Sequence, residues 1–367
     1  MNPAVIHRLW FGDDPAARAT RVAMLPFAGL FRAVVAGRNG LYEVGLLSVH
    51  DTPIPAIAVG NITVGGTGKT PVSAWIAGRL RAQGARPALV LRGYGDDEPL
   101  VHRLLNPGIP VIVAPDRVRG VEEAAAMGAT VAVLDDAFQH RRVRRAADVV
   151  LVSADQGLDR SALLPRGPFR EPLAALRRAS IVLVTRKAAS AARAAEVVAR
   201  VEAVAPDVPV GVVHLGLGDL RRVRHAPTGE LAEGALSGGG RGDPRHALEE
   251  TRPLAALRGE AVLAVAALGE PAAFLAQLRA AGARVEPAVF PDHHQFTGDD
   301  IRRILATYPG AGSIVCTLKD AVKLGPRWPR EAPALWYVTQ VAALERGASD
   351  LDAVLHRAAR ADPNSQS

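Results

Sequence analysis

The sequence predicts an α/β protein, with a doubly wound parallel sheet followed by a second, smaller α/β lobe. Short apolar runs alternate along the chain with segments of helical spacing, which is the pattern of parallel strands covered by helices on both faces. The first of these runs, 56–59, leads through a glycine-rich turn into a helix. This order is typical of folds that bind phosphate groups at a helix N-terminus.

The alternation also divides the chain. The main sheet is expected to use strands at 56–59, 88–91, 111–114, 131–134, 149–152 and 181–185, with helices that include 72–83, 117–127 and 188–204. Residues 216–260 are rich in charge, proline and glycine, which indicates a hairpin or linker. Strands then resume at 261–266, 284–290, 313–317 and 334–338, with helices at 272–281 and 299–307.

We therefore expect five segments. They are an N-terminal amphipathic helical segment (1–50), a nucleotide-binding core (51–210), a hairpin and linker with a flexible insertion around 228–246 (211–260), a smaller α/β lobe (261–360) and a polar tail (361–367).

Composition narrows the class of protein. A hydrophobic fraction of 49% is enough for sizeable cores, and the net charge of +7 suits an anionic partner. The single cysteine, Cys316, excludes an intramolecular disulfide and favours a reducing compartment. A membrane-spanning helix is not expected, because no run of about 18 uncharged apolar residues occurs. Nucleic-acid-binding motifs are also missing, so a nucleic-acid partner is not expected. We expect the protein to be a monomer.

The glycine-rich turn reads Gly60-Asn61-Ile62-Thr63-Val64-Gly65-Gly66-Thr67-Gly68-Lys69-Thr70-Pro71. It follows the P-loop pattern G-x-x-x-x-G-K-[ST], except that Thr63 stands at the first glycine position, and it predicts a fold like that of the P-loop NTPases. In a P-loop, Lys69 would reach the outer phosphates and the Thr70 hydroxyl would ligate Mg²⁺. The alternative interpretation of this stretch is a glycine-rich β-turn that binds no nucleotide. The residues expected to bind the nucleotide are Thr63, Val64, Gly65, Gly66, Thr67, Gly68, Lys69 and Thr70.

Two carboxylates follow the apolar run 131–134. Because parallel strands end at the ligand edge of such a sheet, Asp135 and Asp136 would lie beside the phosphates, where they could hold Mg²⁺ together with Thr70. A turn or helix cap is the plainer alternative. A guanine-specific N-K-x-D sequence is absent, so an adenine nucleotide, ATP, is favoured.

Other clusters suggest roles that remain open at this point. The acidic loop 92–99 could present a general base, and the His–Asp pair within 290–296 could handle a proton or be structural. The basic loop 165–172 suits an anionic substrate. Residues 17–47 combine helical apolar spacing with arginines, so this helix either lies on an anionic membrane or packs on its own domain.

Taken together, these motifs resemble the tetraacyldisaccharide 4'-kinase family, the lipid A 4'-kinases of Gram-negative bacteria. The matching pieces span nearly the whole chain. They are the turn 60–71, R-G-Y-G at 92–95, D-E-P at 97–99, D-D-A-F-Q-H at 135–140, G-P-F-R-E-P at 167–172, F-P-D-H-H at 290–294 and K-D-A-V-K-L at 319–324. Two departures are Ala137, where the family has glycine, and the short spacing between R-G-Y and D-E-P.

The resemblance implies the reaction. ATP would phosphorylate the 4'-hydroxyl of tetraacyldisaccharide 1-phosphate to give lipid IV-A, at the cytoplasmic face of the bacterial inner membrane, which the N-terminal helix would contact. Asp97 would deprotonate the hydroxyl with support from His293, and Lys69 would complete the catalytic set. The implied substrate-binding residues are Asn61, Arg117, Gln139, His140, Arg170 and Glu171. The alternatives are a P-loop metallochaperone or GTPase-like switch, and a membrane-peripheral ATPase.

Overall fold

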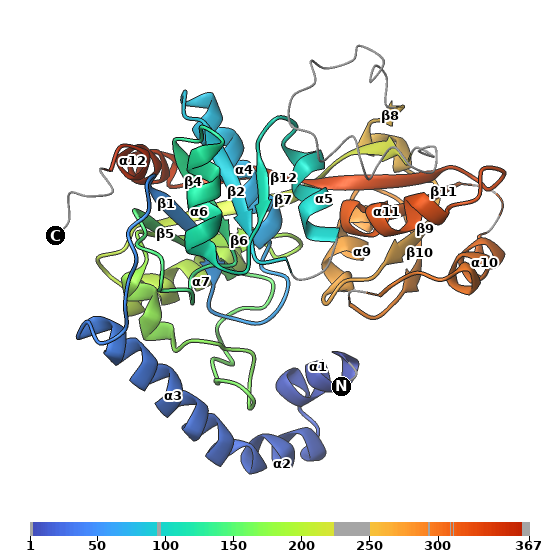
Figure 1. Cartoon of the computed structure of the whole chain (residues 1–367). Coiled ribbons are helices and arrows are strands. Elements are labelled where there is room, and N and C mark those ends of the chain that lie inside the picture. The colour runs from blue at the N-terminus through green and yellow to red at the C-terminus, as the bar shows by residue number, and fades with distance from the viewer. Residues whose placement is uncertain are drawn as a thin grey trace. The chain divides into compact units, whose positions relative to one another are not determined.

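The computed structural model describes residues 3–93, 97–223, 250–292, 294–308, 310 and 312–361. The chain forms two compact units, one of Met1–Leu215 with Ala342–Ser367 and one of Gly216–Val341. Each unit contains parallel strands flanked by helices, as the sequence predicts (Figure 1).

The sheet of the first unit is parallel throughout, in the order β7-β6-β5-β1-β4-β2-β3. In β1, Val59 pairs with Asp135 of β4, so the start of the glycine-rich turn lies beside the carboxylates. The strands are β1 (Ala56–Asn61), β2 (Pro87–Leu91), β3 (Val111–Val113), β4 (Val131–Asp135), β5 (Ala147–Ser153), β6 (Ile181–Arg186) and β7 (Val210–Arg222), of which residues 210–215 belong to this unit.

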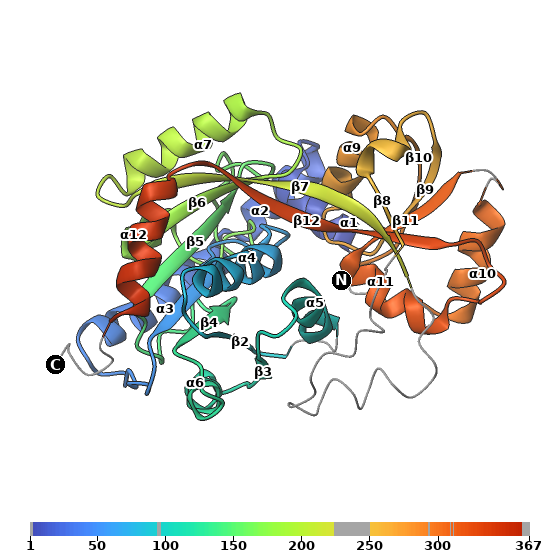
Figure 2. The ribbon, with the colours of Figure 1, turned by 90° about the horizontal axis from the view of Figure 1, so that it is seen from above.

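Helices cover both faces of this sheet, because alternate residues of its buried strands point to opposite sides. One face packs against α4 (Lys69–Ala82) and α12 (Ala348–Ala359), which lie side by side (Figure 2). The other face packs against α6 (Arg117–Ala126) and α7 (Ala191–Val204). The short helix α5 (Asp97–Leu105) packs on α4 and β3.

The C-terminal helix differs from the expected division. The sequence analysis places residues up to 360 in the smaller lobe, whereas α12 belongs to the first unit. Leu351, Val354 and Leu355 are buried in the same core as the apolar side of α4. The Arg79–Asp352 ion pair, at 2.6 Å, also joins α4 to α12. These contacts connect segments about 270 residues apart in sequence. The alternation of strands and helices along the chain therefore does not predict that α12 packs on the first unit.

The second unit has its own parallel strands in the order β10-β9-β11-β12. They are β9 (Ala261–Ala266), β10 (Arg284–Val289), β11 (Ser313–Thr317) and β12 (Leu335–Arg346), with the helices α9 (Pro271–Ala280), α10 (Gly298–Thr307) and α11 (Leu318–Leu324). The hairpin expected within 211–260 corresponds to the antiparallel pairing of β7 with β8 (Thr251–Arg252). The insertion around 228–246 and the tail after Ala361 lie outside the described residues.

Three helices precede the first strand among the described residues, where the sequence analysis expects one helical segment. They are α1 (Pro3–Phe11), α2 (Pro15–Ala23) and α3 (Leu25–Glu43), drawn in blue in Figure 1. In the parts of the chain that the structure describes, none of the helices is by itself long and apolar enough to cross a membrane. Helices α2 and α3, which are bent by 47° at the break between them, meet the length and composition requirement only as a pair.

Candidate active site

The glycine-rich turn connects β1 to the N-terminus of α4. Gly68 is the residue before the helix and has φ = +85°, a conformation that favours glycine. A Cβ atom at Gly68 would also lie 2.3 Å from Cδ1 of Leu215, so this position has no room for a side chain. Lys69 is the first residue of α4. Its ammonium group therefore lies at the positive end of a helix, where anions bind.

The backbone of the turn is held by three hydrogen bonds from outside the turn. The Thr185 hydroxyl, in β6, donates to the carbonyl of Thr67 over 2.9 Å, and Lys187 Nζ donates to that of Gly66 over 2.5 Å. The amide of Val64 donates to the carbonyl of Pro168 over 2.7 Å. The loop is therefore bound both to the end of β6 and to the basic loop 165–172.

Asp135 ends β4 and is nearly fully buried. Its Oδ1 accepts a hydrogen bond of 2.8 Å from the Ser73 hydroxyl, and its Oδ2 lies 3.0 Å from Nε2 of His102. Burial alone would raise the pKa of this carboxyl. The hydrogen bonds from His102 and Ser73, with the charge of Lys69, outweigh burial and hold the pKa of Asp135 below its usual value.

Asp136 faces the phosphate loop. Its φ of +48° places it in the left-handed region, which aspartate tolerates better than most residues and which often occurs at functional sites. One carboxylate oxygen lies 4.0 Å from Lys69 Nζ, and the other accepts from Arg170 Nη2 over 2.9 Å. Arg170 also donates to the side-chain oxygen of Asn61. A carboxylate between two cations at a helix N-terminus can bind a phosphate–metal complex, since it offers both oxygen ligands and positive charge.

Three further residues from the sequence analysis support this cluster. Gln139 Nε2 donates to the backbone oxygen of Asn61 over 2.7 Å, and Asn61 Nδ2 donates to the Thr67 hydroxyl over 2.8 Å. Arg117 is almost fully buried and donates to the carbonyls of Ala114 and Asp135, each over 3.0 Å. Burial lowers the pKa of Arg117 to about 10, so it stays charged and fixes the end of β4.

The sequence profile of the tetraacyldisaccharide-1-P 4'-kinase family matches residues 20–360. The chain belongs to this family. Relatives named tetraacyldisaccharide 4'-kinase include one from Anaeromyxobacter sp. (strain K), 37% identical over 98% of this chain and 96% of the relative. Another, from Halorhodospira halophila (strain DSM 244 / SL1), is 35% identical over 90% of each chain. The family and the kinase class predicted from the sequence are therefore confirmed.

A solved structure is similar to the whole chain. LpxK from Aquifex aeolicus, crystallised in complex with ATP, matches with a TM-score of 0.65 at 24% identity, over 92% of this chain and 99% of that chain. This likeness confirms the predicted α/β fold.

The family motif R-E-P places Glu171 at a buried position rather than on an open surface. Its side chain is 0% exposed. Its two oxygens accept from Arg38 Nη2 and Asn39 Nδ2 of α3, each over 2.9 Å, and Arg178 Nη2 lies 3.3 Å away. Glu171 therefore attaches α3 to the loop that carries Arg170.

The two residues implied in proton transfer differ in what the structure describes. Asp97 is the first residue of α5 and is buried, so it stands at a helix N-terminus rather than within the acidic loop that the sequence analysis expects. His293 lies outside the described residues. Its neighbour His294 contacts Asp300 through Nε2 over 2.9 Å, and Asp300 also forms the capping box of α10 with Thr297.

The family implies Mg²⁺, and the residues present fit it. Mg²⁺ usually keeps several waters and binds one or two carboxylates together with substrate phosphates, so it needs no cage of protein ligands. Thr70 in the first turn of α4 and the oxygens of Asp135 and Asp136 supply this donor set. Within the described ranges, groups of three or more His, Cys, Asp or Glu that could hold a metal ion do not occur.

Sequence reasoning missed the residues that hold the site from behind. Ser73 and His102 bind Asp135, and Lys187 binds the phosphate loop. One signal was present in the sequence: His102 interrupts the apolar side of its helix, next to Val101 and five residues after Asp97.

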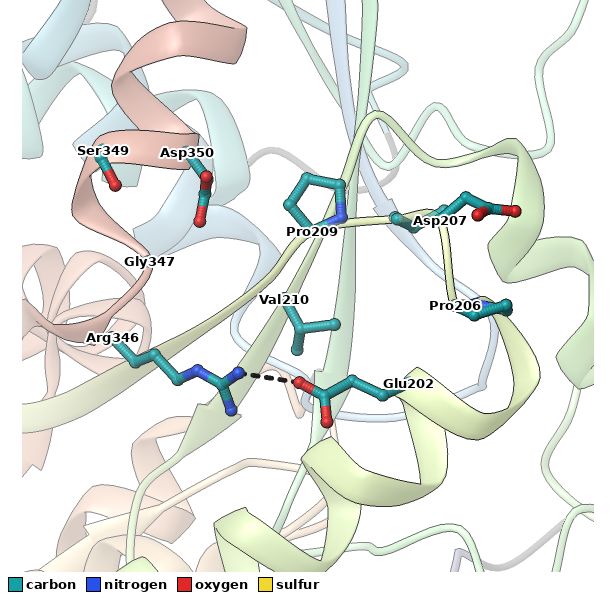
Figure 3. A pocket seen from close by; sticks show the side chains of 10 residues that line it. Glu202, Pro206, Asp207, Pro209, Val210, Arg346, Gly347, Ser349 and Asp350 are labelled. Atoms are coloured by element: carbon teal, nitrogen blue, oxygen red, sulfur yellow. Dashed lines mark hydrogen bonds and ion pairs between the residues drawn. The ribbon is translucent and has the colours of Figure 1, made fainter.

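A shallow pocket of about 630 Å³ lies away from this site (Figure 3). It lies between the end of α7 and the start of α12, where Arg346 pairs with Glu202 over 2.8 Å. Val210 at the start of β7 lines it, so it lies at the amino-terminal edge of the sheet. Ligands of open parallel sheets bind at the opposite, carboxyl edge, where the phosphate loop is found.

Proposed function

We propose that this chain transfers the γ-phosphate of ATP to the 4'-hydroxyl of tetraacyldisaccharide 1-phosphate, giving lipid IV-A in lipid A biosynthesis. The observation that carries the proposal is the cluster of Lys69, Asp136 and Arg170 at the N-terminus of α4. Family membership supports the choice of substrate.

Phosphate binding is assigned to the loop. Backbone amides at the end of the turn and the ammonium group of Lys69 hold the β- and γ-phosphates, and the positive end of α4 adds to the attraction. Thr70, Asp135 and Asp136 hold Mg²⁺, which neutralises charge on the phosphates when it is bound. Lys69 then stabilises the charge that develops on the transferred group.

Proton transfer is assigned to Asp97, with His293 in support. Asp97 is the first residue of α5, and a carboxylate that is positioned beside the hydroxyl can accept its proton. Orientation of the hydroxyl against the phosphate contributes as much as basicity, because phosphoryl transfer depends mainly on positioning.

The glycolipid is assigned to the side chains that remain partly exposed around the cluster. Arg170, Gln139 and His140 are each partly exposed and can reach a bound disaccharide. Burial and the two nearby arginines, Arg117 and Arg145, lower the pKa of His140, so it is neutral near pH 7 and can donate or accept a hydrogen bond. Asn61 is buried and acts on substrate through its hydrogen bonds with Arg170 and Gln139, and the buried Arg117 acts through its charge on His140. Glu171 is buried too, but it holds α3.

The cytoplasmic surface of the inner membrane is the proposed location, reached through α2 and α3. Phe27, Leu30 and Val34 are 58%, 65% and 61% exposed, whereas Val35 is buried against the rest of the unit. Of the nearby arginines, Arg18 and Arg32 are exposed and can meet anionic headgroups. Helix α3 thus has one packed side and one apolar side toward solvent, which suits an interfacial helix.

The membrane assignment is tested by flotation with vesicles that contain anionic lipid. Leu30→Asp should abolish most binding, and raised salt should weaken what remains. Met127→Asp, which changes an equally exposed residue after α6, is the matched control. Equal binding by all three proteins at low and high salt would leave α3 as a helix with no membrane contact.

The reaction is tested by transfer of labelled γ-phosphate from ATP to a panel of acylated disaccharide 1-phosphates. Lys69→Ala should reduce turnover by about 10²-fold or more. Arg81→Ala removes a cation from the same helix, bound only to the carbonyl of Pro107 among the contacts described, and should leave turnover close to wild type. ATP hydrolysis that proceeds equally without glycolipid would favour a peripheral ATPase instead.

A further inference from the structure

A buried histidine stands behind the carboxylate pair. The side chain of His102 is 0% exposed, and its Nε2 lies 3.0 Å from Oδ2 of Asp135, whose side chain is only 7% exposed. The other oxygen of Asp135 is taken by the Ser73 hydroxyl at 2.8 Å and by the backbone amide of Asp136 at 2.9 Å. Every oxygen of this carboxylate therefore has a fixed partner.

The chemistry of the contact assigns its direction. An ionised carboxylate only accepts hydrogen bonds, so Nε2 of His102 carries the hydrogen and donates it. A hydrogen bond to a charged group is stronger than one between neutral groups, and it gains further strength away from water. His102 thereby fixes the rotamer of Asp135 in a way that an apolar side chain of the same size cannot.

Among the contacts described, two buried hydrogen bonds join α5 and the residue that follows it to the core. In its last turn, His102 binds Asp135. Just after its end, Asn106 Nδ2 donates to the carbonyl of Ala74 in α4 over 2.7 Å. The first contact reaches the proposed metal carboxylate, whereas the second reaches only helix backbone. The two therefore provide a comparison between a contact at the site and a contact that serves packing.

We propose that His102 is a positioning residue for phosphoryl transfer. It orients Asp135 toward the metal–phosphate site and sets the register of α5, the helix that begins with the proposed base Asp97, against that site. The proposal rests on the proposed kinase function, because it gives His102 a role through Asp135 and Asp97. Partners of metal-binding carboxylates commonly matter this way, and their loss costs about 10- to 100-fold in metal affinity or activity.

The test compares three variants. His102→Leu keeps volume and removes the donor, whereas His102→Gln keeps an N–H at a similar reach. Asn106→Ala is the matched control, because it removes the buried hydrogen bond to Ala74 just after α5 and leaves Asp135 untouched. Two readouts are needed: steady-state turnover at varied Mg²⁺, and calorimetric binding of a non-hydrolysable ATP analogue with and without Mg²⁺.

We expect His102→Leu to lower kcat or the apparent Mg²⁺ affinity by about 10- to 100-fold. Binding of the analogue without Mg²⁺ should change little, and the gain in affinity on adding Mg²⁺ should shrink. His102→Gln should recover most of both losses. Asn106→Ala should lower the melting temperature without changing the Mg²⁺ dependence.

Two outcomes would overturn the proposal. One is a His102→Leu protein whose turnover and Mg²⁺-dependent binding stay within about twofold of wild type. The other is an equal loss in His102→Leu, His102→Gln and Asn106→Ala that follows their melting temperatures, which would make His102 a packing residue. If the wild-type protein binds Mg²⁺ and the analogue but phosphorylates no glycolipid, the kinase proposal is refuted instead. The binding measurements would then still test whether His102 supports Mg²⁺-dependent binding of the analogue.

Discussion

Glu171→Gln probes the buried carboxylate that joins α3 to the active-site loop. The substitution keeps the shape of the side chain and removes its charge. In the native protein both oxygens accept hydrogen bonds, from Arg38 and from Asn39, each over 2.9 Å. A glutamine must present its NH₂ group to one of these donors, so one contact becomes repulsive and the charge of Arg178 loses its counterion at 3.3 Å.

The magnitude follows from burial. Breaking a buried ion pair by removing one partner costs about 3–5 kcal/mol. Glu171 is 0% exposed, but Arg38 is 36% exposed and Arg178 is 21% exposed, so solvent screens part of the loss. We therefore expect the free energy of unfolding to fall by about 2–4 kcal/mol. Glu202→Gln is the control, because Glu202 and its partner Arg346 are 46% and 55% exposed; it should cost less than about 1 kcal/mol.

Urea unfolding and limited proteolysis measure the effect. Glu171→Gln should lower the midpoint, and cleavage within 25–43 should become faster because α3 loses its attachment. The Glu202→Gln protein should resemble wild type in both assays. If Glu171→Gln is as stable as Glu202→Gln and α3 remains equally protected, the network at Glu171 does not hold this helix.

Three further outcomes are expected. Gly68→Ala should lower the free energy of unfolding by roughly 2–4 kcal/mol and abolish ATP binding, because it combines a positive φ with a clash at Leu215. Gly84→Ala is the control, since Gly84 also has a positive φ but has open space around it. Urea unfolding and calorimetric ATP binding measure both variants. Hydrogen bonds from the backbone and hydroxyl of Thr297, and then from His294, hold the pKa of Asp300 below its usual value, so the stability it contributes is present above about pH 4 and is lost as pH falls; Asp300→Asn should flatten the dependence of stability on pH in that acidic range, and an unchanged slope would contradict this. Asp97→Ala and His293→Ala should each lower kcat with ATP binding little changed, and the double variant should lose far less than the product of the two effects, since residues that act as a unit are not additive.

The sequence predicts the positions of strands well where both faces of the strand are buried. The first four residues of β1 and of β4 are apolar, so the positions of both strands were predicted to within two residues. β7 was not predicted, because its second half, Gly216–Arg222, mixes glycine with charges, and its extension is set by pairing with β8. α5 was also missed, since its first turn contains the acidic motif and Pro99, although proline is tolerated there.

The sequence predicts residues of the candidate site only where they lie next to the end of a strand or the start of a helix. Lys69, Asp135 and Asp136 were placed by that rule. The contact of His102 with Asp135 spans 33 residues and that of Ser73 spans 62. No local pattern encodes such pairs, because they depend on how α4 and α5 pack on the sheet. Glu171 likewise resembled a substrate contact in its motif, whereas its burial assigns it to α3.

Arg170 and Glu171 are adjacent in sequence, but we expect Arg170 to support turnover and Glu171 to hold α3. The backbone amide of Arg170 is fixed to the carbonyl of Ile62 over 2.8 Å, next to the end of β1. The backbone between the two side chains is therefore anchored, so a change at one need not disturb the contacts of the other. Arg170→Lys keeps the charge but loses the forked geometry that binds Asp136 and Asn61, so it should lower turnover and leave α3 protected from proteolysis. Glu171→Gln should do the reverse. If both variants lose turnover and α3 protection to the same extent, the loop moves as one unit and the two residues cannot be assigned separate roles.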